Sequence, residues 1–474
     1  MPNPASLPPS SLLIALTGGP GTSKTRLMAE LAAAQIARGQ RVEGVLSIAG
    51  NRSAPHQGAS EYWLRIIGSD VELPWATRDE ALNPPYFFEP GTAKKLQAWA
   101  DRLRTLPPPP LLLLDEFGRF ELRGLGLMPV WPPLVAAAPQ VVVITVRDDL
   151  VGTMEELLGR KFDVCIPAQA PDALAQLQRA CEDFGEWTRI GLFGGASGGL
   201  EMSAGAMLHA AKIPARGLAM CSLQGAMMTF AGFGLAQPGR VVWVPFISAG
   251  LKALSPAGSR VRPMIAICVQ GLLYGGTVQV LGWNVLAVVL GGALIGAWSA
   301  LQGILLQYLL MGEELIRAYD STVLWISEHW GVNAPSLPVL MGAWAIFCAL
   351  VAGGVAAAAW KLRAPPAALR KIIEREKGTA APVATPRPRG RWREFAHWQF
   401  WLPLLVVSGI LLAVGRPWES VAWLALRFVA VGFLLMTLVS LLRPARWAES
   451  LRKRGWWGPA LAMSGAFSRR EQTK

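Results

Sequence analysis

The chain has 474 residues, a formal net charge of +13, and 52% apolar against only 16% charged residues. This length predicts two or three domains, and the low charged fraction excludes a chain that is soluble throughout. Much of the positive charge flanks apolar stretches and does not alternate with aromatic residues, so we expect no nucleic-acid partner. The five cysteines are scattered without a CxxC pair, which argues against a metal site or a disulfide framework.

Strand-like and helix-like patterns alternate over the first 184 residues. This alternation predicts an α/β domain with a mostly parallel sheet and helices on both faces. Two of the expected strands are continuous apolar runs, as is typical of the centre of a parallel sheet. The expected strands cover 12–16, 41–48, 61–67, 111–115, 141–145 and 162–166, and the expected helices cover 24–38, 91–106 and 171–183.

The first expected strand leads into the sequence GGPGTSKT and then into a helix. A Gly-rich turn of this kind points backbone N–H groups at phosphate oxygens, and the start of the helix adds a positive dipole end. We expect Lys24 to reach the β- and γ-phosphates and Thr25 to bind Mg²⁺. The expected nucleotide-binding residues are Gly18, Gly19, Gly21, Thr22, Ser23, Lys24 and Thr25. The pattern has glycine where this chain has Ser23, and the alternative is an ordinary Gly-rich strand-to-helix turn.

A run of four leucines ends in two acids, Asp115 and Glu116. This pattern predicts a buried strand that brings a carboxylate to the edge of the sheet where ligands bind. We expect Asp115 to hold Mg²⁺ through water, and Glu116 to orient or deprotonate an attacking water. The alternative is a strand that ends in solvated acids.

The GGPGTSKT loop followed by DEFGRFEL at 115–122 resembles the small kinase-like P-loop nucleoside-triphosphatase family over residues 10–170. The resemblance implies a P-loop fold and Mg²⁺-dependent hydrolysis of ATP or another nucleoside triphosphate. It also implies that Glu121 supports the site, the alternative being a solvated loop acid. Arg52 and Arg147 are further candidates for the phosphate side, the alternative being surface arginines.

Apolar windows of spanning length recur in the remainder of the chain and predict an all-α polytopic membrane domain of six to eight helices. They lie at 189–210, 217–236, 241–257, 263–283, 284–310, 337–360, 399–415 and 419–442, and an interfacial helix is expected at 313–336. The expected domains are a P-loop domain (1–184), a helical membrane domain (187–360), a basic Pro-rich linker (361–398), two further membrane helices (399–442) and a basic tail (443–474).

The distribution of Lys and Arg predicts the orientation of the chain in a cytoplasmic (inner) membrane. We expect the N-terminal domain, the linker and the tail to lie in the cytosol, where nucleoside triphosphates are available. Ionisable residues inside spans are functional candidates, and Glu201 and Arg427 are the strongest of them here. Lys252 lies nearer to a span end.

Residues 187–360 also resemble the S components of energy-coupling-factor transporters, through the rhythm of their spans and a first span that is rich in small residues. The resemblance implies a solute pocket and a membrane coupling subunit that docks on the first span. The alternative is that the small residues pack within their own helical bundle.

Three functions therefore remain open from the sequence. The first is a nucleoside-triphosphatase tethered to the membrane. The second is a solute-binding transporter component with a fused regulatory nucleotide domain, because the transporter-ATPase signature LSGGQ does not occur in the sequence. The third is a nucleotide sensor without turnover, which the serine at position 23 keeps open.

Overall fold

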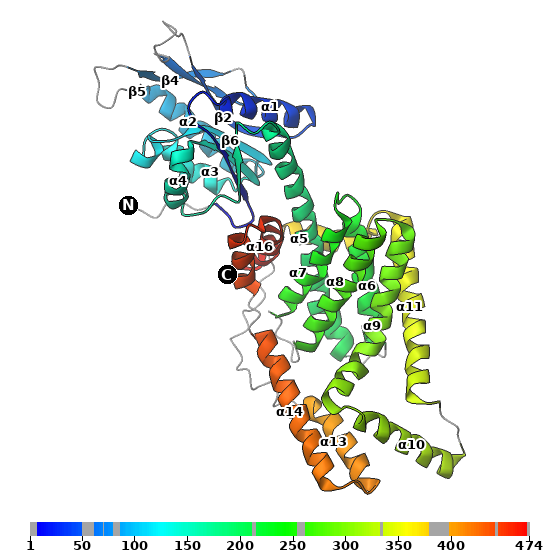
Figure 1. The fold of residues 1–474 in the computed structure, drawn as a ribbon. Helices are drawn as coiled ribbons and strands as arrows, with labels where there is room; N and C mark the ends of the chain where they lie inside the picture. The colour runs from blue at the N-terminus through cyan, green and yellow to red at the C-terminus, as the bar shows by residue number, and fades with distance from the viewer. Residues whose placement is uncertain are drawn as a thin grey trace. The chain divides into compact units, whose positions relative to one another are not determined.

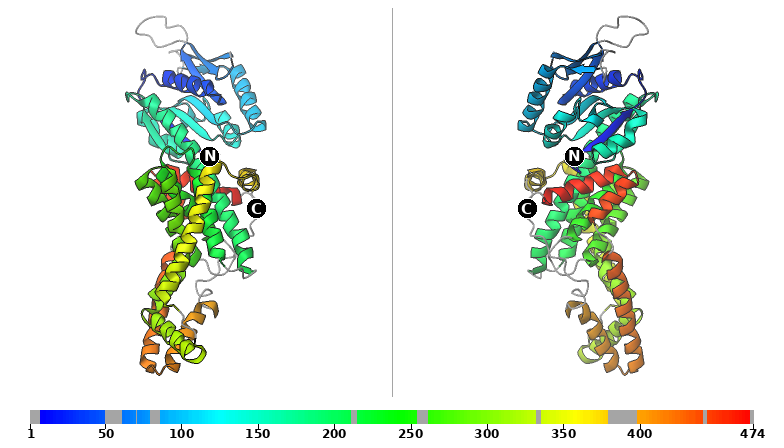
Figure 2. Two further views of the ribbon diagram at one scale, coloured as in Figure 1. Left: turned by 90° about the vertical axis from the view of Figure 1, so that its right-hand side faces the viewer. Right: turned by 90° about the vertical axis from the view of Figure 1, so that its left-hand side faces the viewer.

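The computed structural model describes residues 7–49, 61–69, 71–78, 86–210, 215–253, 261–331, 335–378, 398–440 and 444–471. The chain divides into two compact units. The N-terminal unit contains Met1–Trp187 and Leu451–Leu461, and the helical unit contains Thr188–Ser450 and Ala462–Lys474. Figures 1 and 2 show a sheet with helices in the first unit and helices alone in the second.

An eight-stranded sheet forms the centre of the N-terminal unit, in the order β5-β4-β3-β2-β6-β7-β1-β8. The strands are β1 (Leu12–Thr17), β2 (Val42–Ala49), β3 (Glu61–Ile66), β4 (Glu72–Arg78), β5 (Tyr86–Phe88), β6 (Leu111–Phe117), β7 (Val141–Val146) and β8 (Val164–Pro167). Strands β2, β6, β7, β1 and β8 are parallel neighbours. The carboxyl ends of β1, β6 and β7 therefore meet at one edge of the sheet.

The two central strands β1 and β7 are buried along their whole length and are paired from Leu12↔Val141 to Thr17↔Val146. Their apolar sequences, LLIALT and VVVITV, are those of strands covered on both faces. Both strands lie where the sequence pattern predicts them.

The sheet is mixed, because β3, β4 and β5 form an antiparallel extension beyond the parallel strands β2, β6, β7, β1 and β8. The sequence pattern did not indicate β4 or β5. Strand β4 contains Pro74, whose ring removes a ladder donor, and β5 has only three residues. Short connections suffice to join antiparallel strands, so this part of the sheet needs no crossover helix.

Helices cover both faces of the sheet (Figure 1). They are α1 (Lys24–Ala37), α2 (Pro90–Thr105), α3 (Trp131–Ala136) and α4 (Val151–Leu157). On one face, α2, α3 and α4 share a buried cluster with alternate residues of β1, β6 and β7, for example Leu13 and Leu112. Helix α1 packs on β2 and β6, and its buried residues Leu27, Met28 and Leu31 lie outside that cluster, on the other face.

Helix α5 (Ala173–Ala210) runs without a break for 38 residues. The expected helix at 171–183 and the expected first span at 189–210 are therefore parts of one helix. Its first residues belong to the N-terminal unit and the residues from Thr188 onward to the helical unit.

The helical unit contains the remaining helices of the described chain (Figure 2). They are α6 (Arg216–Gly232), α7 (Trp243–Ala253), α8 (Val261–Leu281), α9 (Val285–Met311), α10 (Glu314–Trp330), α11 (Leu337–Leu362), α12 (Ala367–Gly378), α13 (Trp398–Ala413), α14 (Trp418–Ser440), α15 (Pro444–Lys453) and α16 (Trp457–Glu471), the last two being shared with the N-terminal unit. Helix α12 falls within the expected linker, and α15 and α16 fall within the expected tail.

Three helices in the described part of the chain are long and apolar enough to cross a membrane. They cover Pro263–Leu281, Val285–Met311 and Leu337–Leu362, and a shorter apolar helix covers Leu404–Ala413. The three agree with the expected spans at 263–283, 284–310 and 337–360. The expected span at 241–257 lies only in part within the described residues, where α7 covers 11 residues up to Ala253.

Small residues let helices of this unit approach closely. A Cβ atom at Gly296 of α9 would lie 2.2 Å from the backbone oxygen of Cys348 in α11. A Cβ atom at Gly194 of α5 would lie 2.7 Å from the Cβ of Ile247 in α7. Small residues of α5 therefore pack within their own bundle.

Candidate nucleotide site

The Gly18–Thr25 loop connects the carboxyl end of β1 to the first turn of α1. The N–H of Gly18 donates to the carbonyl of Val146 at the end of β7, over 3.3 Å, and anchors the loop at the sheet edge. Gly21 has φ 76°, and Ser23 has φ 59° and ψ 21°, both in the left-handed region. Glycine adopts this conformation readily, whereas a serine is strained there by roughly 1–2 kcal/mol. Ser23 makes no side-chain cap hydrogen bond at the start of α1.

The ammonium group of Lys24 folds back into the loop. It donates to the carbonyls of Gly18 and Gly19, each over 2.7 Å, and to Oγ1 of Thr22 over 3.3 Å. Burial lowers the pKa of Lys24, and the nearby Asp115 carboxylate acts in the opposite direction. The cation therefore lies inside the loop, bonded to the loop's own carbonyls and hydroxyl group.

The acid at the end of the leucine run lies next to the loop. Oγ1 of Thr25 donates to Oδ2 of Asp115 over 2.6 Å, and the Asp115 residue is only 1% exposed. The two residues expected to share a cation are thus in direct contact, although they lie on different elements, α1 and β6.

Asp115 is held in place by two residues that the sequence analysis missed, Ser47 and Thr145. The backbone N–H of Ser47 donates to Oδ2 over 3.2 Å, and Oγ1 of Thr145 donates to Oδ1 over 2.8 Å. Both residues are buried and lie near the carboxyl ends of β2 and β7. Neither strand sequence, VEGVLSIA or VVVITV, indicates that its hydroxyl residue faces Asp115, because this position follows only from the alignment of the strands.

Glu116 follows Asp115 in a left-handed conformation with φ 60°. Its backbone N–H donates to Oγ1 of Thr145 over 2.7 Å and to Oδ1 of Asp115 over 3.0 Å, which holds this conformation. The residue as a whole is exposed, whereas its carboxyl group lies near Asp115 and the Ser47 side chain and is largely surrounded by protein atoms. Burial of the carboxyl group, followed by the charge of Asp115, raises the pKa of Glu116 to about 7, while a hydrogen bond from the Ser47 side chain opposes the shift. Strained backbone at a charged residue is a feature of functional sites.

Glu121 stabilises the loop that follows Glu116. Its carboxylate accepts from the backbone N–H of Gly118 over 2.7 Å and from that of Leu127 over 2.9 Å. The residue is 2% exposed, and its burial raises the pKa of the carboxyl group although both hydrogen bonds lower it. The buried position is incompatible with a solvated loop acid, and the contacts are with the protein backbone.

Of the two arginine candidates for the phosphate side, the structure describes Arg147 only. Arg147 follows β7, and its charge is close enough to Lys24 to contribute to lowering the pKa of that lysine. Its Nε lies 3.3 Å from Oδ1 of Asp149. Arg52 lies outside the described residues.

The intramembrane candidates Glu201 and Arg427 lie on α5 and α14 of the helical unit. The carbonyl of Glu201 accepts from Nζ of Lys252 over 2.9 Å. Nη1 of Arg427 lies near Gly312, 2.6 Å from where a Cβ atom would be. Neither of these contacts joins Glu201 to Arg427.

Within the described residues, no cluster of three or more His, Cys, Asp or Glu side chains could hold a metal ion. The loop offers a different donor set, the hydroxyl of Thr25 and the carboxylate of Asp115. Hydroxyl and carboxylate oxygens suit Mg²⁺, which keeps most of its waters and takes few protein ligands. The chain matches no protein-family model, no curated protein and no solved structure.

Proposed function

We propose that the N-terminal unit has a P-loop fold, binds a nucleoside triphosphate with Mg²⁺ and hydrolyses it to the diphosphate and phosphate. The observation that carries this proposal is the 2.6 Å contact between Thr25 and Asp115 at the carboxyl edge of a parallel sheet. Ligands of open α/β sheets bind at that edge, and a Gly-rich loop before a helix is suited to phosphate groups. Either feature alone has an ordinary structural explanation, whereas their direct contact fits a shared ligand.

The residues of the site have distinct roles in this proposal. Lys24 leaves the loop carbonyls and binds the phosphate oxygens, which neutralises charge as the terminal phosphoryl group is transferred. The loop N–H groups orient the phosphates. The Glu116 carboxylate orients the attacking water and accepts its proton, for which a pKa of about 7 is suitable. Glu121 and Thr145 position Glu116 through the backbone.

Thr25 and Asp115 are the residues that would hold Mg²⁺, with Asp115 acting through water. The ion supplies charge neutralisation on the phosphate oxygens. The buried Asp115 carboxylate keeps its orientation through Thr145 and the Ser47 N–H.

Phosphate release by the purified full-length chain in detergent tests the proposal, with ATP and the other nucleoside triphosphates as substrates. We expect Mg²⁺-dependent release, and a loss of roughly 100-fold or more in Lys24→Ala and in Glu116→Gln. Lys94→Ala and Glu156→Gln are matched controls, because both residues are exposed and distant in sequence from the loop. Equal rates in the wild-type chain and in both site variants would refute hydrolysis at this site.

A nucleotide sensor is the second candidate, and the conformation of the loop favours it. Ser23 is strained, and Lys24 already satisfies the loop carbonyls, so nucleotide binding must rearrange the loop. A loop of this kind suits a switch that changes shape on binding. Tight nucleotide binding with negligible phosphate release would select the sensor.

For the helical unit we propose an integral inner-membrane domain with six to eight crossings, three of which are the long apolar helices. Buried polar groups in this unit favour a solute-binding, transport-like role. Oγ of Ser197 donates to Oε1 of Gln224 over 2.5 Å, and Nε2 of Gln224 and Oγ of Ser248 have no hydrogen-bond partner among the described residues. Thermal stabilisation of the full-length chain by vitamins or nucleobase-type solutes tests this role, and no stabilisation across the panel would count against it.

A further inference from the structure

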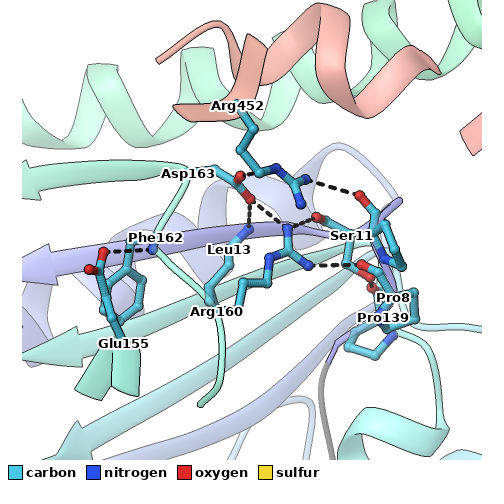
Figure 3. A network of polar contacts seen from close by, with 10 residues as sticks. Pro8, Ser11, Leu13, Pro139, Glu155, Arg160, Phe162, Asp163 and Arg452 are labelled. Atoms are coloured by element: carbon cyan, nitrogen blue, oxygen red, sulfur yellow. Dashed lines mark hydrogen bonds and ion pairs between the residues drawn. The ribbon is translucent and has the colours of Figure 1, made fainter. Parts of the chain in front are cut away.

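A buried ionic network lies at the amino end of β1, at the opposite end of this strand from the Gly18–Thr25 loop (Figure 3). Its centre is Asp163, whose side chain is 0% exposed. Oδ2 of Asp163 accepts from the backbone N–H of Leu13 over 3.0 Å and from Nη2 of Arg160 over 2.7 Å. The carboxylate therefore fixes the beginning of β1 to the turn that precedes β8.

Arg160 strengthens the same connection. Its guanidinium group donates to the carbonyls of Pro8 over 2.8 Å and of Ser11 over 2.5 Å. These bonds hold the segment that enters β1. Arg160 and Leu13 together occupy one of the two oxygens of Asp163.

The other carboxylate oxygen, Oδ1, faces a residue from the far end of the chain. Nε of Arg452 lies 2.8 Å from Oδ1 of Asp163, and Nη2 of Arg452 donates to the carbonyl of Pro9 over 3.0 Å. The Arg452 side chain is 21% exposed, so this ion pair is largely removed from solvent. Figure 3 shows Arg452 reaching the network from a helix above the strand.

The same segment has a second, apolar contact with the N-terminal unit. A Cβ atom at Gly458 would lie 2.1 Å from Nε1 of Trp187, so only a glycine allows this close approach. Ala460 and Leu461 are 1% and 2% exposed. The segment thus combines a charged anchor at one end with close packing at the other.

We propose that Leu451–Leu461 is an intramolecular clamp that completes the N-terminal unit by docking on the Asp163 network. Removing Arg452 takes away the cation beside the buried Oδ1 of Asp163, while Oδ2 keeps its pair with Arg160, and the loss of one partner of a buried ionic network is destabilising. The clamp holds the amino end of β1, and the phosphate loop follows the carboxyl end, so the clamp can stabilise the strand that carries the site without touching the ligand. This proposal stands independently of the proposed nucleotide chemistry.

The clamp also constrains the path of the chain. The chain leaves the N-terminal unit through α5 and returns to it at Leu451. If the intervening stretch is embedded in a membrane, it must cross that membrane an even number of times. The clamp and the nucleotide site then lie in the same compartment.

Hydrogen–deuterium exchange of the full-length chain in nanodiscs tests the clamp. We expect Arg452→Ala to increase exchange at least several-fold in peptides that cover 8–17 and 160–167, and Arg452→Lys to increase it less. Arg454→Ala is the matched control, because Arg454 is exposed and lies two residues away on the same segment. Gly458→Ala tests the apolar contact separately and is expected to increase exchange in the same peptides. Wild-type exchange in both Arg452→Ala and Gly458→Ala would overturn the proposal.

If Arg452→Ala does not accumulate as folded protein while Arg454→Ala and Arg452→Lys do, this result also supports the clamp.

A measurement of membrane topology tests the clamp without a destabilised variant. A membrane-impermeant maleimide is applied to right-side-out and inverted vesicles that contain Arg454→Cys, and labelled peptides are identified by mass spectrometry. We expect the exposed native Cys165 and the cysteine introduced at position 454 to be labelled in the same vesicle preparation. Labelling of the two in opposite preparations would overturn the clamp.

Discussion

The hydroxyl of Thr25 donates a 2.6 Å hydrogen bond to the carboxylate of Asp115, across 90 residues of sequence. The contact exists because β1 and β6 are parallel and are separated in the sheet by β7 alone. Thr25 follows β1 through the Gly-rich loop and lies in the first turn of α1, and Asp115 lies near the carboxyl end of β6 itself. The proposed triphosphate and its Mg²⁺ depend on this juxtaposition.

Replacing Asp115 by Asn tests its role as a cation ligand. The amide keeps the volume of the side chain and removes its charge, so we expect the affinity for Mg²⁺ in the presence of nucleotide to fall by roughly 10–100-fold. Titration of Mg²⁺ into a nucleotide-binding assay measures this change. Asp172→Asn serves as the control, because Asp172 is an exposed acid of the same unit. An unchanged Mg²⁺ requirement in Asp115→Asn would assign the cation to other residues.

Replacing Ser23 by Gly tests the strain in the loop. Glycine removes the penalty of the left-handed conformation at φ 59°, but it also raises the entropy of the unfolded chain. We expect a net gain in the free energy of unfolding of up to about 1 kcal/mol. Ser23→Val should destabilise the unit, because a β-branched residue fits this region poorly. Thermal unfolding compares the three proteins, and a destabilised Ser23→Gly variant would contradict the assigned conformation.

Glu121 should act as a structural support of the site. In Glu121→Gln one acceptor oxygen becomes an NH₂ group, so the N–H of Gly118 or Leu127 loses its partner. An unsatisfied buried donor costs about 1–3 kcal/mol, and we expect a loss of stability of this size. We also expect faster amide exchange in the loop from Gly118 to Leu127. Glu156→Gln, a substitution of an exposed residue, should leave both quantities unchanged, and normal exchange in Glu121→Gln would refute the supporting role.

The raised pKa of Glu116 predicts a pH dependence of stability in the protein free of nucleotide and Mg²⁺. The pKa rises from 4.5 to about 7 on folding, chiefly through burial and secondly through Asp115. The protonated form is therefore favoured in the folded state, so the contribution of Glu116 to stability is complete below pH 4.5 and is lost as the pH rises through about 7. We expect the unfolding midpoint to fall less over this range in Glu116→Gln than in the wild-type chain. Identical pH profiles would show that the Glu116 carboxyl group is not shifted.

The sequence predicted the central part of the N-terminal sheet well, because its strands have strong local signals. Strands β1 and β7 are unbroken apolar runs and lie within one residue of their expected ends. The loop and the DE pair were recognised by their residue types and spacing. The contact between Thr25 and Asp115 also follows from a parallel sheet, since the carboxyl ends of such strands share an edge.

Features that depend on tertiary contacts were not predictable in this way. Strand β4 contains Pro74, which argues against a strand in the sequence, and it is stabilised by pairing with β3 and β5. Thr145 and Ser47 look like minor polar residues in apolar strands until β2, β6 and β7 are aligned. The pairing of Arg452 with Asp163 joins residues that are far apart in the sequence, and no local pattern indicates it.

Equilibrium binding of ATP to the full-length chain, with Mg²⁺ and with EDTA, tests most directly whether Thr25 and Asp115 share a cation with a triphosphate. Thr25→Val removes the hydroxyl group and retains a β-branched side chain of similar size. We predict that Mg²⁺ strengthens ATP binding to the wild-type chain and that this gain disappears in Thr25→Val. Absence of ATP binding to the wild-type chain, or an equal gain from Mg²⁺ in both proteins, would contradict the account.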